Sequence, residues 1–344
     1  MSATFAFYRL PYADHYIAIE GSAQELSSCV LLDGLTGFVI APFELTADQP
    51  IVVIHPDLVE RRPLQNADAF SVDTLQSSAD RSHYAVDFAS FHSQIQAGCF
   101  AKLVLARRSE EVVTPSVDPV MLFHKACQLY PRMFIALVST PQSGVWLTAT
   151  PEILLEGQGH QWRTVALAGT MMLEGEQLKG EGENVVWSAK NIKEQRIVAT
   201  YIAECLGQFH ADFCEEGPRT VRAAHLVHLR SDFTFTLPDD SSIGLLLQAL
   251  HPTPAVCGIP KREAFNFIVR NEYAPRRYYS GFLGPLRLDG ATHLYVSLRC
   301  MNIDGSHCYL YAGGGLLADS NEQQEWLETE AKLQTMRRLL VRNS

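Results

Sequence analysis

Four glutamates follow three consecutive glycines near the end of the chain, in the segment YLYAGGGLLADSNEQQEWLETEAKL of residues 309–333. The second half of this segment predicts a helix, on which Glu325, Glu328 and Lys332 are spaced i, i+3 and i+7 and project from one face. Two carboxylates and an ammonium group there could bind a cation and an anion together. From this segment alone, a solvent-exposed helix face, with acids favoured near its N-terminus by the helix dipole, is the simpler interpretation.

A second predicted helix, over residues 185–209, could supply another metal ligand. Lys190 and Glu194 share one of its faces at spacing i, i+4, and apolar residues form another face. Mg²⁺ usually takes one or two protein carboxylates and completes its octahedron with water and ligand oxygens, which one glutamate from each helix would satisfy. A salt bridge between Lys190 and Glu194 explains the spacing equally well.

Two further ionisable residues lie in apolar surroundings. Lys102 lies within the predicted strand CFAKLVLARRSE, where partial burial would lower its pKa and suit it to act as a general base; protection of a strand edge is the alternative. Glu152 follows a proline between two apolar runs. Burial there would raise its pKa and suit it to act as an acid, whereas exposure at a β-turn is the alternative.

The composition restricts the class of protein. The 344 residues are 47% hydrophobic, which is enough for a large core, and the net charge of −10 without a long basic run argues against nucleic-acid binding. Eight scattered cysteines without a Cys-x-x-Cys pair indicate reduced, mostly buried thiols. Because the sequence has no run of about 18 apolar residues and no signal-peptide pattern at its start, we expect a cytoplasmic protein without membrane contact.

Predicted strands and helices mix without a βαβ repeat, which favours an α+β fold with large, mainly antiparallel sheets in a sandwich-like core and flanking helices. We expect residues 1–80 to be a divergent, β-rich part of the same domain and residues 85–344 to be the catalytic region. The pattern predicts single strands over 144–157 and 292–304 and a mobile loop over 65–83. The proline-rich loop of residues 250–260 could wall a small-molecule pocket.

Segments from about residue 85 to the end, taken in order, closely resemble the chorismate-utilising enzymes, which include isochorismate synthase, salicylate synthase, anthranilate synthase component I and aminodeoxychorismate synthase component I. Each segment alone is weak evidence, but the ordered set is highly specific. It comprises KLVLARR, TPEILLE, ALAGT, KNIKEQ, VHL, LHPTPAVCGIP, YYSGFLG, SLRC and AGGGLLADSNEQQEWLETEAK.

The resemblance implies that chorismate is the substrate and that its ring carboxylate is bound together with Mg²⁺. It assigns Glu194 and Glu328 as metal ligands and Glu325 as a neighbouring or water-mediated ligand. The remaining implied contacts to the substrate are of two kinds: the anion contacts Arg299, Gly313, Gly314 and Lys332, and the pocket residues Gly169, Thr170 and His228, the last of them near C4 of the substrate.

The branch of the family depends on what attacks C2 of chorismate. Lys102, where anthranilate synthases have Gln, and Ala168, where aminodeoxychorismate synthases have a nucleophilic Lys, resemble the water-using branch, so we expect no glutamine amidotransferase subunit. In that branch Lys102 would deprotonate the attacking water and Glu152 would protonate the departing C4 hydroxyl. Ala255, where salicylate synthases have Thr, favours an isochorismate synthase of menaquinone or siderophore biosynthesis over a salicylate synthase.

A non-catalytic chorismate-binding subunit is a third interpretation, which the retention of Lys102, Glu152, Glu194 and Glu328 together disfavours. Two positions depart from the family pattern. Arg277 stands where Gly is usual, which could alter the rim of the pocket. Asn191 replaces a commoner acid one helical turn before Glu194, which could weaken the affinity for the metal.

Overall fold

The computed structural model describes residues 4–66, 74–78, 81–173, 185–209, 212–223, 226–238 and 243–341. Six α-helices lie within these ranges: α1 (Arg81–Gln96), α2 (Pro119–Leu129), α3 (Ala189–Gln208), α4 (Gly244–Leu250), α5 (Lys261–Asn271) and α6 (Glu322–Leu340). The strands are β1 (Phe5–Arg9), β2 (His15–Leu26), β3 (Gly37–Ala41), β4 (Ile51–Pro63), β5 (Thr74–Ser78), β6 (Lys102–Thr114), β7 (Phe134–Thr140), β8 (Gly144–Thr150), β9 (Ile153–Gln158), β10 (Gln161–Met172), β11 (Phe213–Ala223), β12 (Leu226–Thr236), β13 (Gly258–Ile259), β14 (Phe282–Leu286), β15 (Ala291–Val296), β16 (Cys300–Asp304) and β17 (His307–Leu316).

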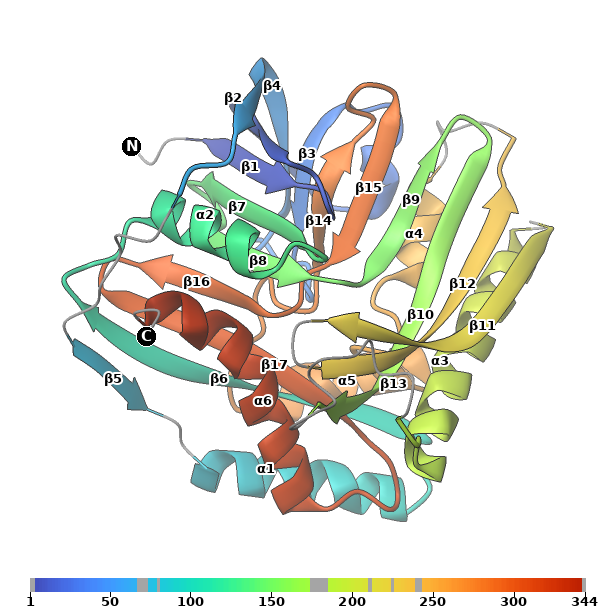
Figure 1. The fold of residues 1–344 in the computed structure, drawn as a ribbon. Helices are drawn as coiled ribbons and strands as arrows, with labels where there is room; N and C mark the ends of the chain where they lie inside the picture. The colour runs from blue at the N-terminus through green and yellow to red at the C-terminus, as the bar shows by residue number, and fades with distance from the viewer. Residues whose placement is uncertain are drawn as a thin grey trace.

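The strands form one continuous hydrogen-bonded network, and the pairings between the described strands are antiparallel. Its long ladders join β2 to β4, β6 to β17 and β10 to β12. The helices lie on the outside of this network (Figure 1). The predicted α+β class with large, mainly antiparallel sheets is therefore confirmed.

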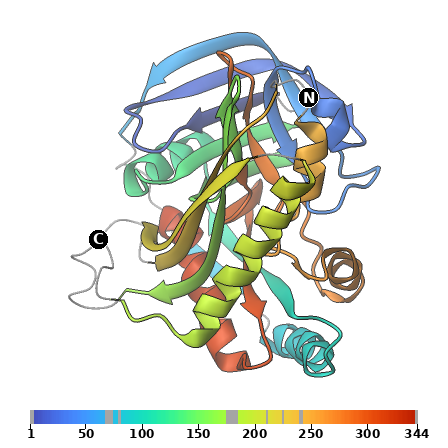
Figure 2. The same ribbon diagram turned by 90° about the vertical axis from the view of Figure 1, so that its right-hand side faces the viewer.

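The apolar core is divided into layers. One cluster of buried residues, which includes Phe38, Phe134, Trp146 and Tyr295, contains no helical residue and packs strand against strand. Three other clusters pack helices onto the outer faces of the strands: α3 with α4, α2 with α6, and α1 with α5. This helix-free cluster is the interior that a sandwich-like core requires, and Figure 2 shows α3 lying along the outside of the strands.

The N-terminal strands are part of the same network. β1 pairs with β7, and β3 pairs with β14 from the C-terminal third of the chain. The loop predicted over residues 65–83 is only partly described: residues 67–73 and 79–80 lie outside the described ranges. Residues 74–78 form the strand β5, whose backbone pairs with β6 in antiparallel register, so the loop prediction is wrong for these five residues.

Two predicted strands are each broken in the middle, at the same level of the molecule. Residues 144–157 divide into β8 and β9 at Pro151, which has no N–H to donate. Residues 292–304 divide into β15 and β16 before Arg299, whose φ of +46° leaves the extended region. The two broken strands stay together across the break, because Val296 N–H donates to Glu152 O (2.9 Å) and Ala149 N–H donates to Arg299 O (3.1 Å).

All eight cysteines are free thiols. Five of them are buried, Cys29 is partly buried, and Cys99 and Cys214 are exposed, which agrees with the expectation of mostly buried thiols. None of the helices in the described ranges is long and apolar enough to cross a membrane.

Candidate functional site

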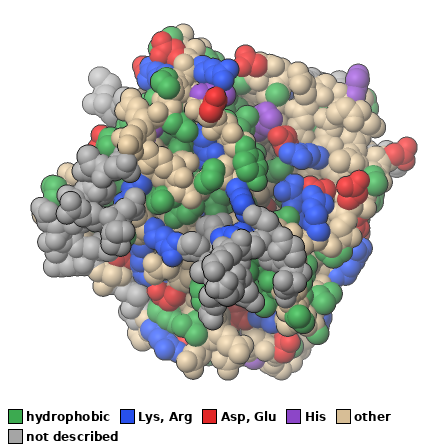
Figure 3. Space-filling view, in the orientation of Figure 1, with side chains coloured by type: hydrophobic (Ala, Val, Ile, Leu, Met, Phe, Trp, Pro, Cys, Tyr) green, Lys and Arg blue, Asp and Glu red, His purple; other side chains and the backbone are tan. Residues whose placement is uncertain are grey.

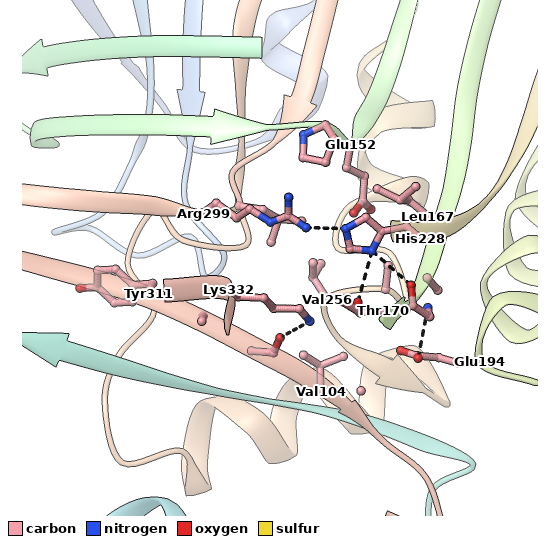
Figure 4. A pocket seen from close by; sticks show the side chains of 18 of the residues that line it. Val104, Glu152, Leu167, Thr170, Glu194, His228, Val256, Arg299, Tyr311 and Lys332 are labelled. Carbon is pink, nitrogen blue, oxygen red and sulfur yellow. Dashed lines mark hydrogen bonds between the residues drawn. The ribbon is translucent and has the colours of Figure 1, made fainter. Parts of the chain in front are cut away.

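A pocket lies where the two broken strands meet the glycine-rich end of β17. It encloses about 610 Å³ of space free of protein atoms, including its opening to solvent. Residues distant in sequence line it together, which Figure 4 shows from close by. Nine of the residues predicted from the sequence are among them: Glu152, Gly169, Thr170, Glu194, His228, Ala255, Arg299, Gly313 and Lys332.

The glycines of β17 let the carboxylates approach the backbone. A Cβ on Gly315 would lie 2.1 Å from Glu194 Oε1, and one on Gly314 would lie 3.2 Å from Glu325 Oε2 and 3.7 Å from Glu328 Oε1. Any other residue at position 315 would therefore displace Glu194. Three carboxylates from α3 and α6 thus converge on two adjacent glycines, so the single helix face that the spacing of Glu325, Glu328 and Lys332 suggested is turned towards the site.

Each of these carboxylates is paired with a lysine. Lys102 Nζ lies 2.9 Å from Glu194 Oε1, Lys332 Nζ lies 2.7 Å from Glu328 Oε1, and Lys190 donates to Glu325 Oε1. Lys190 therefore reaches across to α6 and does not pair with Glu194 on its own helix, so the i, i+4 salt bridge considered from the sequence is wrong. The pairs tie α3, β6 and α6 together around the pocket.

The surroundings of Glu194 and Glu325 shift the pKa values of these two carboxyl groups in opposite directions. Burial opposes ionisation of Glu194, but the ammonium groups of Lys102, Lys332 and Lys190 more than offset it and lower the pKa of its carboxyl. Burial and the neighbouring charge of Glu328 raise the pKa of Glu325, although Lys190 opposes this. Glu194 is therefore a carboxylate at neutral pH, which is the form that a metal ligand needs.

These residues fit a magnesium ion bound through few protein ligands. Glu325 Oε2 is buried and accepts no hydrogen bond, so one acceptor beside Gly314 is unused. Within the described residues, no three His, Cys, Asp or Glu side chains are close enough together to hold a metal ion by themselves. Mg²⁺ does not need such a group, because one or two carboxylates with water and ligand oxygens complete its octahedron.

Lys102 is fully buried at the start of β6, so its interpretation as exposed protection of a strand edge is wrong. It is absent from the pocket lining and lies directly behind it: its Cε is 2.8 Å from where a Cβ on Gly315 would be, and Gly315 and Glu194 both line the pocket. Its ammonium group is close to Glu194 but is not aligned for a hydrogen bond. Only a glycine and a carboxylate separate it from the cavity.

Glu152 is 3% exposed and lies at the break between β8 and β9, so burial is confirmed and exposure at a turn is wrong. Burial raises the pKa of its carboxyl to about 8, and the positive charges of Lys102, Arg299 and Lys332 counteract part of that rise. At neutral pH the group is mostly protonated and can donate a proton into the pocket.

Arg299 and His228 form a buried pair on the wall between Glu152 and Thr170 (Figure 4). Arg299 Nη2 lies 2.5 Å from His228 Nε2, and because a guanidinium can only donate, Nε2 is the acceptor. His228 Nδ1–H then donates to Gly169 O (3.1 Å), close to Thr170 Oγ1 (3.2 Å). Burial and the charges of Arg299 and Lys332 keep the pKa of His228 well below its usual value, so the ring is neutral.

Arg299 offers the pocket a charged donor for an anion. It is 6% exposed, and its Nη1 is buried without a hydrogen-bond partner, so one charged donor remains available for a ligand. Burial lowers its pKa to about 10, which still leaves it charged at neutral pH. Lys332 also lines the pocket, where its Nζ donates to Gly313 O (2.8 Å).

A β-bulge and the proline-rich loop complete the walls. The register of β10 against β12 shifts at Gly169, whose φ of +71° favours glycine and whose N–H donates to Glu194 Oε2 (3.3 Å). A Cβ on Gly169 would lie 3.2 Å from Asn191 Cβ, so the small Asn191 packs beneath the bulge. Ala255 lines the pocket, which confirms that the proline-rich loop is a wall.

Arg277 does not line the pocket, so the expected change at its rim is wrong. Its φ is +52°, which explains why glycine is usual there, and its Nη1 donates to Asn302 Oδ1 (2.9 Å). Two wall residues, Tyr279 and Tyr311, were not predicted from the sequence; their rings are stacked with centroids 5.6 Å apart on one wall of the pocket. Alternation along β17 could have indicated Tyr311, because it lies two residues before Gly313.

Comparisons with known proteins agree with this geometry. A family model described as "chorismate binding enzyme" matches residues 54–341. The "salicylate biosynthesis isochorismate synthase" of Pseudomonas aeruginosa is 31% identical over 273 residues, which are 77% of this chain and 56% of that protein. The isochorismate synthase DhbC of Bacillus subtilis is 30% identical, over 72% of this chain and 65% of that protein. The chain thus spans less than two thirds of the length of these relatives.

Solved structures show the same fold along almost the whole chain. The structure described as a putative 2,3-dihydroxybenzoate-specific isochorismate synthase from Bacillus anthracis superposes with a TM-score of 0.85 at 24% identity, covering 98% of this chain and 96% of that one. The menaquinone-specific isochorismate synthase of Escherichia coli gives a TM-score of 0.83 at 22% identity, covering 98% and 88%.

Proposed function

We propose that this chain, which belongs to the chorismate-binding enzyme family, is an isochorismate synthase that converts chorismate reversibly into isochorismate. The observation that carries the proposal is that a candidate general acid and a candidate general base lie at different sides of one pocket. Glu152 is a buried, mostly protonated acid on one side, and Lys102, the proposed base, lies behind Glu194 on another. His228 and Thr170 lie between Glu152 and Glu194 (Figure 4).

In the proposed reaction, a hydroxyl group arrives at C2 and another leaves from C4. Water attacks C2, Lys102 in its neutral amine form accepts the proton of that water, and the ring double bonds shift as Glu152 protonates the departing C4 hydroxyl, which leaves as water. Atoms and charge balance without a redox cofactor, and no ammonia-supplying amidotransferase subunit is needed. In enzymes that use acid–base catalysis, two titratable groups in different surroundings commonly divide the roles, one as general base and the other as general acid.

The remaining residues would bind and orient the substrate. Arg299, with its unpaired Nη1, and Lys332 would bind carboxylates, while the bare backbone of Gly313 would let the ring come close. Neutral His228 is held by Gly169 O and Arg299, so it would present a fixed wall near C4. Glu194 and Glu328, with Glu325 beside them, would hold Mg²⁺, which neutralises the substrate's ring carboxylate.

We further infer that the enzyme works in the cytoplasm and that its product serves menaquinone or siderophore biosynthesis. Similarity to enzymes of both kinds, one from Escherichia coli described as MenF and one from Bacillus subtilis described as DhbC, supports this range of use.

The test is to incubate the purified protein with chorismate and Mg²⁺ and to separate the products by chromatography, with a parallel assay for pyruvate. We expect isochorismate without pyruvate, formation of chorismate when isochorismate is supplied, and loss of turnover when the metal is chelated. Salicylate with pyruvate would instead identify a salicylate synthase in which Ala255 does not prevent elimination. Tight binding of chorismate without any product would identify a non-catalytic binding subunit.

A further inference from the structure

A buried ion pair lies behind one wall of the pocket. Glu272 directly follows α5, and Arg276 is four residues later, shortly before the pocket residue Tyr279. Charged side chains usually lie on the surface, where Figure 3 shows them scattered over the face in view. The side chains of Arg276 and Glu272 are only 2% and 4% exposed, and neither residue lines the pocket. Burying two charges is costly, so the pair must be stabilised by the contacts that it makes.

The two side chains bind each other through two parallel hydrogen bonds. Arg276 Nε donates to Glu272 Oε2 and Arg276 Nη2 donates to Glu272 Oε1, each at 2.7 Å. Neighbouring groups hold both residues in place: Glu272 N–H donates to Ile268 O (2.9 Å) at the end of α5, and Arg276 Cζ lies 4.3 Å from the centre of the Phe43 ring. A lysine could not reproduce this geometry, because its ammonium group donates from a single point. The Glu272–Arg276 pair is therefore a fixed unit.

The pair completes an edge of β6 where none of the described strands pairs with it. One edge of β6 pairs with β17, and the other edge pairs with β13 near the start of β6 and with β5 near its end. Val104 and Ala106 lie between these two pairings. Arg276 Nη2 donates to Val104 O (2.8 Å), and Ala106 N–H donates to Glu272 Oε1 (2.7 Å). The pair thus supplies hydrogen bonds that a neighbouring strand would otherwise make.

The guanidinium also reaches the proline-rich loop. Arg276 Nη1 donates to Val256 O (2.6 Å), and the carbonyl of Arg276 accepts from Tyr279 N–H (3.0 Å). Val104, Val256 and Tyr279 all line the pocket, and Figure 4 shows the side chains of Val104 and Val256 among those around it. Because Val104 N–H donates to Cys257 O (2.7 Å), β6 and the loop are in direct contact here. Arg276 therefore contacts the backbone of three wall residues, which come from three segments of the chain.

We propose that Glu272 and Arg276 are positioning residues, which hold β6 and the proline-rich loop at the separation that chorismate requires. The inference rests on the proposed function for the identity of the substrate. β6 begins with Lys102, the proposed base, and the loop carries Ala255 of the pocket wall, so a change in the pair moves both of these residues relative to the substrate. A displacement of about 1 Å, caused by a residue that does not touch the substrate, can lower a rate about 10²-fold.

Arg276→Lys tests the pair, because it keeps the positive charge beside Glu272 but cannot bind both oxygens of Glu272 and both wall carbonyls at once. We expect KM for chorismate, and its dissociation constant measured by calorimetry, to rise about tenfold, and kcat/KM to fall about 10²-fold. Glu272→Gln retains an acceptor for Ala106 N–H, so it should change these constants in the same direction by less. Arg270→Lys is the matched control, because Arg270 is exposed on α5, and it should leave them unchanged.

A double-mutant cycle separates positioning from a general loss of stability. Val256→Ala shortens one of the wall residues that Arg276 holds. Combined with Arg276→Lys, it should lower the logarithm of kcat/KM by less than the sum of the two single changes, because residues in contact are coupled. Thr170→Ala, on β10 and beside His228, should add to Arg276→Lys independently. A thermal unfolding scan of each variant checks that the assays measure folded protein.

The positioning role would be overturned if Arg276→Lys left KM and the dissociation constant within about twofold of the unaltered protein, or if its effect and that of Val256→Ala were additive. A lower midpoint of thermal unfolding with unchanged constants would also overturn it, because the pair would then serve stability alone. These outcomes leave the proposed function intact. Absence of chorismate turnover by the unaltered protein would overturn the proposed function, and absence of calorimetric binding as well would overturn the substrate assigned to these walls.

Discussion

At the scale of single residues, the surroundings of two buried glutamates shift their pKa values in opposite directions. Burial dominates at Glu152 and raises its pKa to about 8, whereas three lysines lower the pKa of Glu194. The burial of Glu152 was predictable from the apolar residues on either side of it. The partner of Lys190 was not predictable, because the choice between Glu194 on the same helix and Glu325 on another depends on tertiary structure.

The raised pKa of Glu152 predicts the pH dependence of the enzyme. Its carboxyl is protonated below about pH 8 and can act as an acid there, so kcat should fall as the pH rises through about 8. Glu152→Gln should lower turnover sharply, and its residual rate should lack this alkaline limb. A pH profile of the two proteins measures both effects; an unaltered limb in the variant would assign the titration to another group.

The same shift affects stability. Because the folded-state pKa of Glu152 is above its ordinary value, its contribution is fully present below about pH 4.5 and is lost as the pH rises through about 8. Glu152→Gln cannot ionise, so its midpoint of thermal unfolding should decrease less than that of the unaltered protein between pH 6 and pH 9, values chosen on either side of that pKa. Equal decreases would contradict the buried, neutral state of Glu152.

Lys102→Ala should reduce turnover by orders of magnitude, since proton transfer by a positioned group contributes about 10²- to 10⁴-fold. Binding of chorismate, measured by calorimetry, should be retained because Arg299 and Lys332 remain. Lys193→Ala is the control, because Lys193 is exposed on the helix that carries Glu194. Near-normal turnover of Lys102→Ala would remove Lys102 from the proton-transfer step.

At the scale of elements, the glycine-rich end of β17 brings α3 and α6 to one place. The sequence predicted both helices and the strand because their periodicities are clear, and the observed bounds differ by only a few residues. It did not predict the breaks in the strands over 144–157 and 292–304. The first of these apolar runs contains one proline and the second contains one arginine, and each could be read as a straight strand. The break in each follows from the pairing of β9 with β15 on one side and of β8 with β16 on the other.

Gly315→Ala should weaken the dependence on Mg²⁺, because its Cβ would lie 2.1 Å from Glu194 Oε1 and force that carboxylate away. We expect a higher Mg²⁺ concentration at half-maximal activity. Gly207→Ala is the matched control: it lies on α3 like Glu194, and a Cβ there meets nothing within 4 Å. It should raise stability slightly and leave the Mg²⁺ titration unchanged. Identical titrations for both variants would contradict the close packing at Gly315.

At the scale of the whole molecule, the site is positive within an acidic protein. Three carboxylates, Glu194, Glu325 and Glu328, face three paired lysines and the additional charge of Arg299, which leaves one positive charge. The family resemblance predicted most of these residues but not this balance, because Lys190 belongs to it only through the fold. The N-terminal strands, about which the resemblance said little, pair with β7 and β14.

The charge balance predicts how the protein responds to ligands. Mg²⁺ alone must enter a positive site and should hardly raise the midpoint of thermal unfolding, whereas Mg²⁺ together with chorismate should raise it clearly, because the dianion offsets the metal charge. Glu328→Gln should reduce this joint stabilisation, whereas Glu322→Gln, on the same helix but paired outward with Arg81, should not. A large shift with Mg²⁺ alone would contradict this balance.

Glu152 and Arg299 lie at breaks in two adjacent strands. The positions of their side chains in the pocket therefore depend on the number of residues in each strand segment beside the break. Neighbouring side chains of a strand point to opposite faces. A single insertion or deletion between Gly144 and Gln158 would therefore either turn Glu152 away from the pocket or shift the register of the strand beside it. Relatives can therefore exchange most side chains and lengthen the outer turns, but alignment gaps should avoid these two segments. We therefore expect relatives to differ in many side chains of these two segments but to keep the same number of residues in each of them.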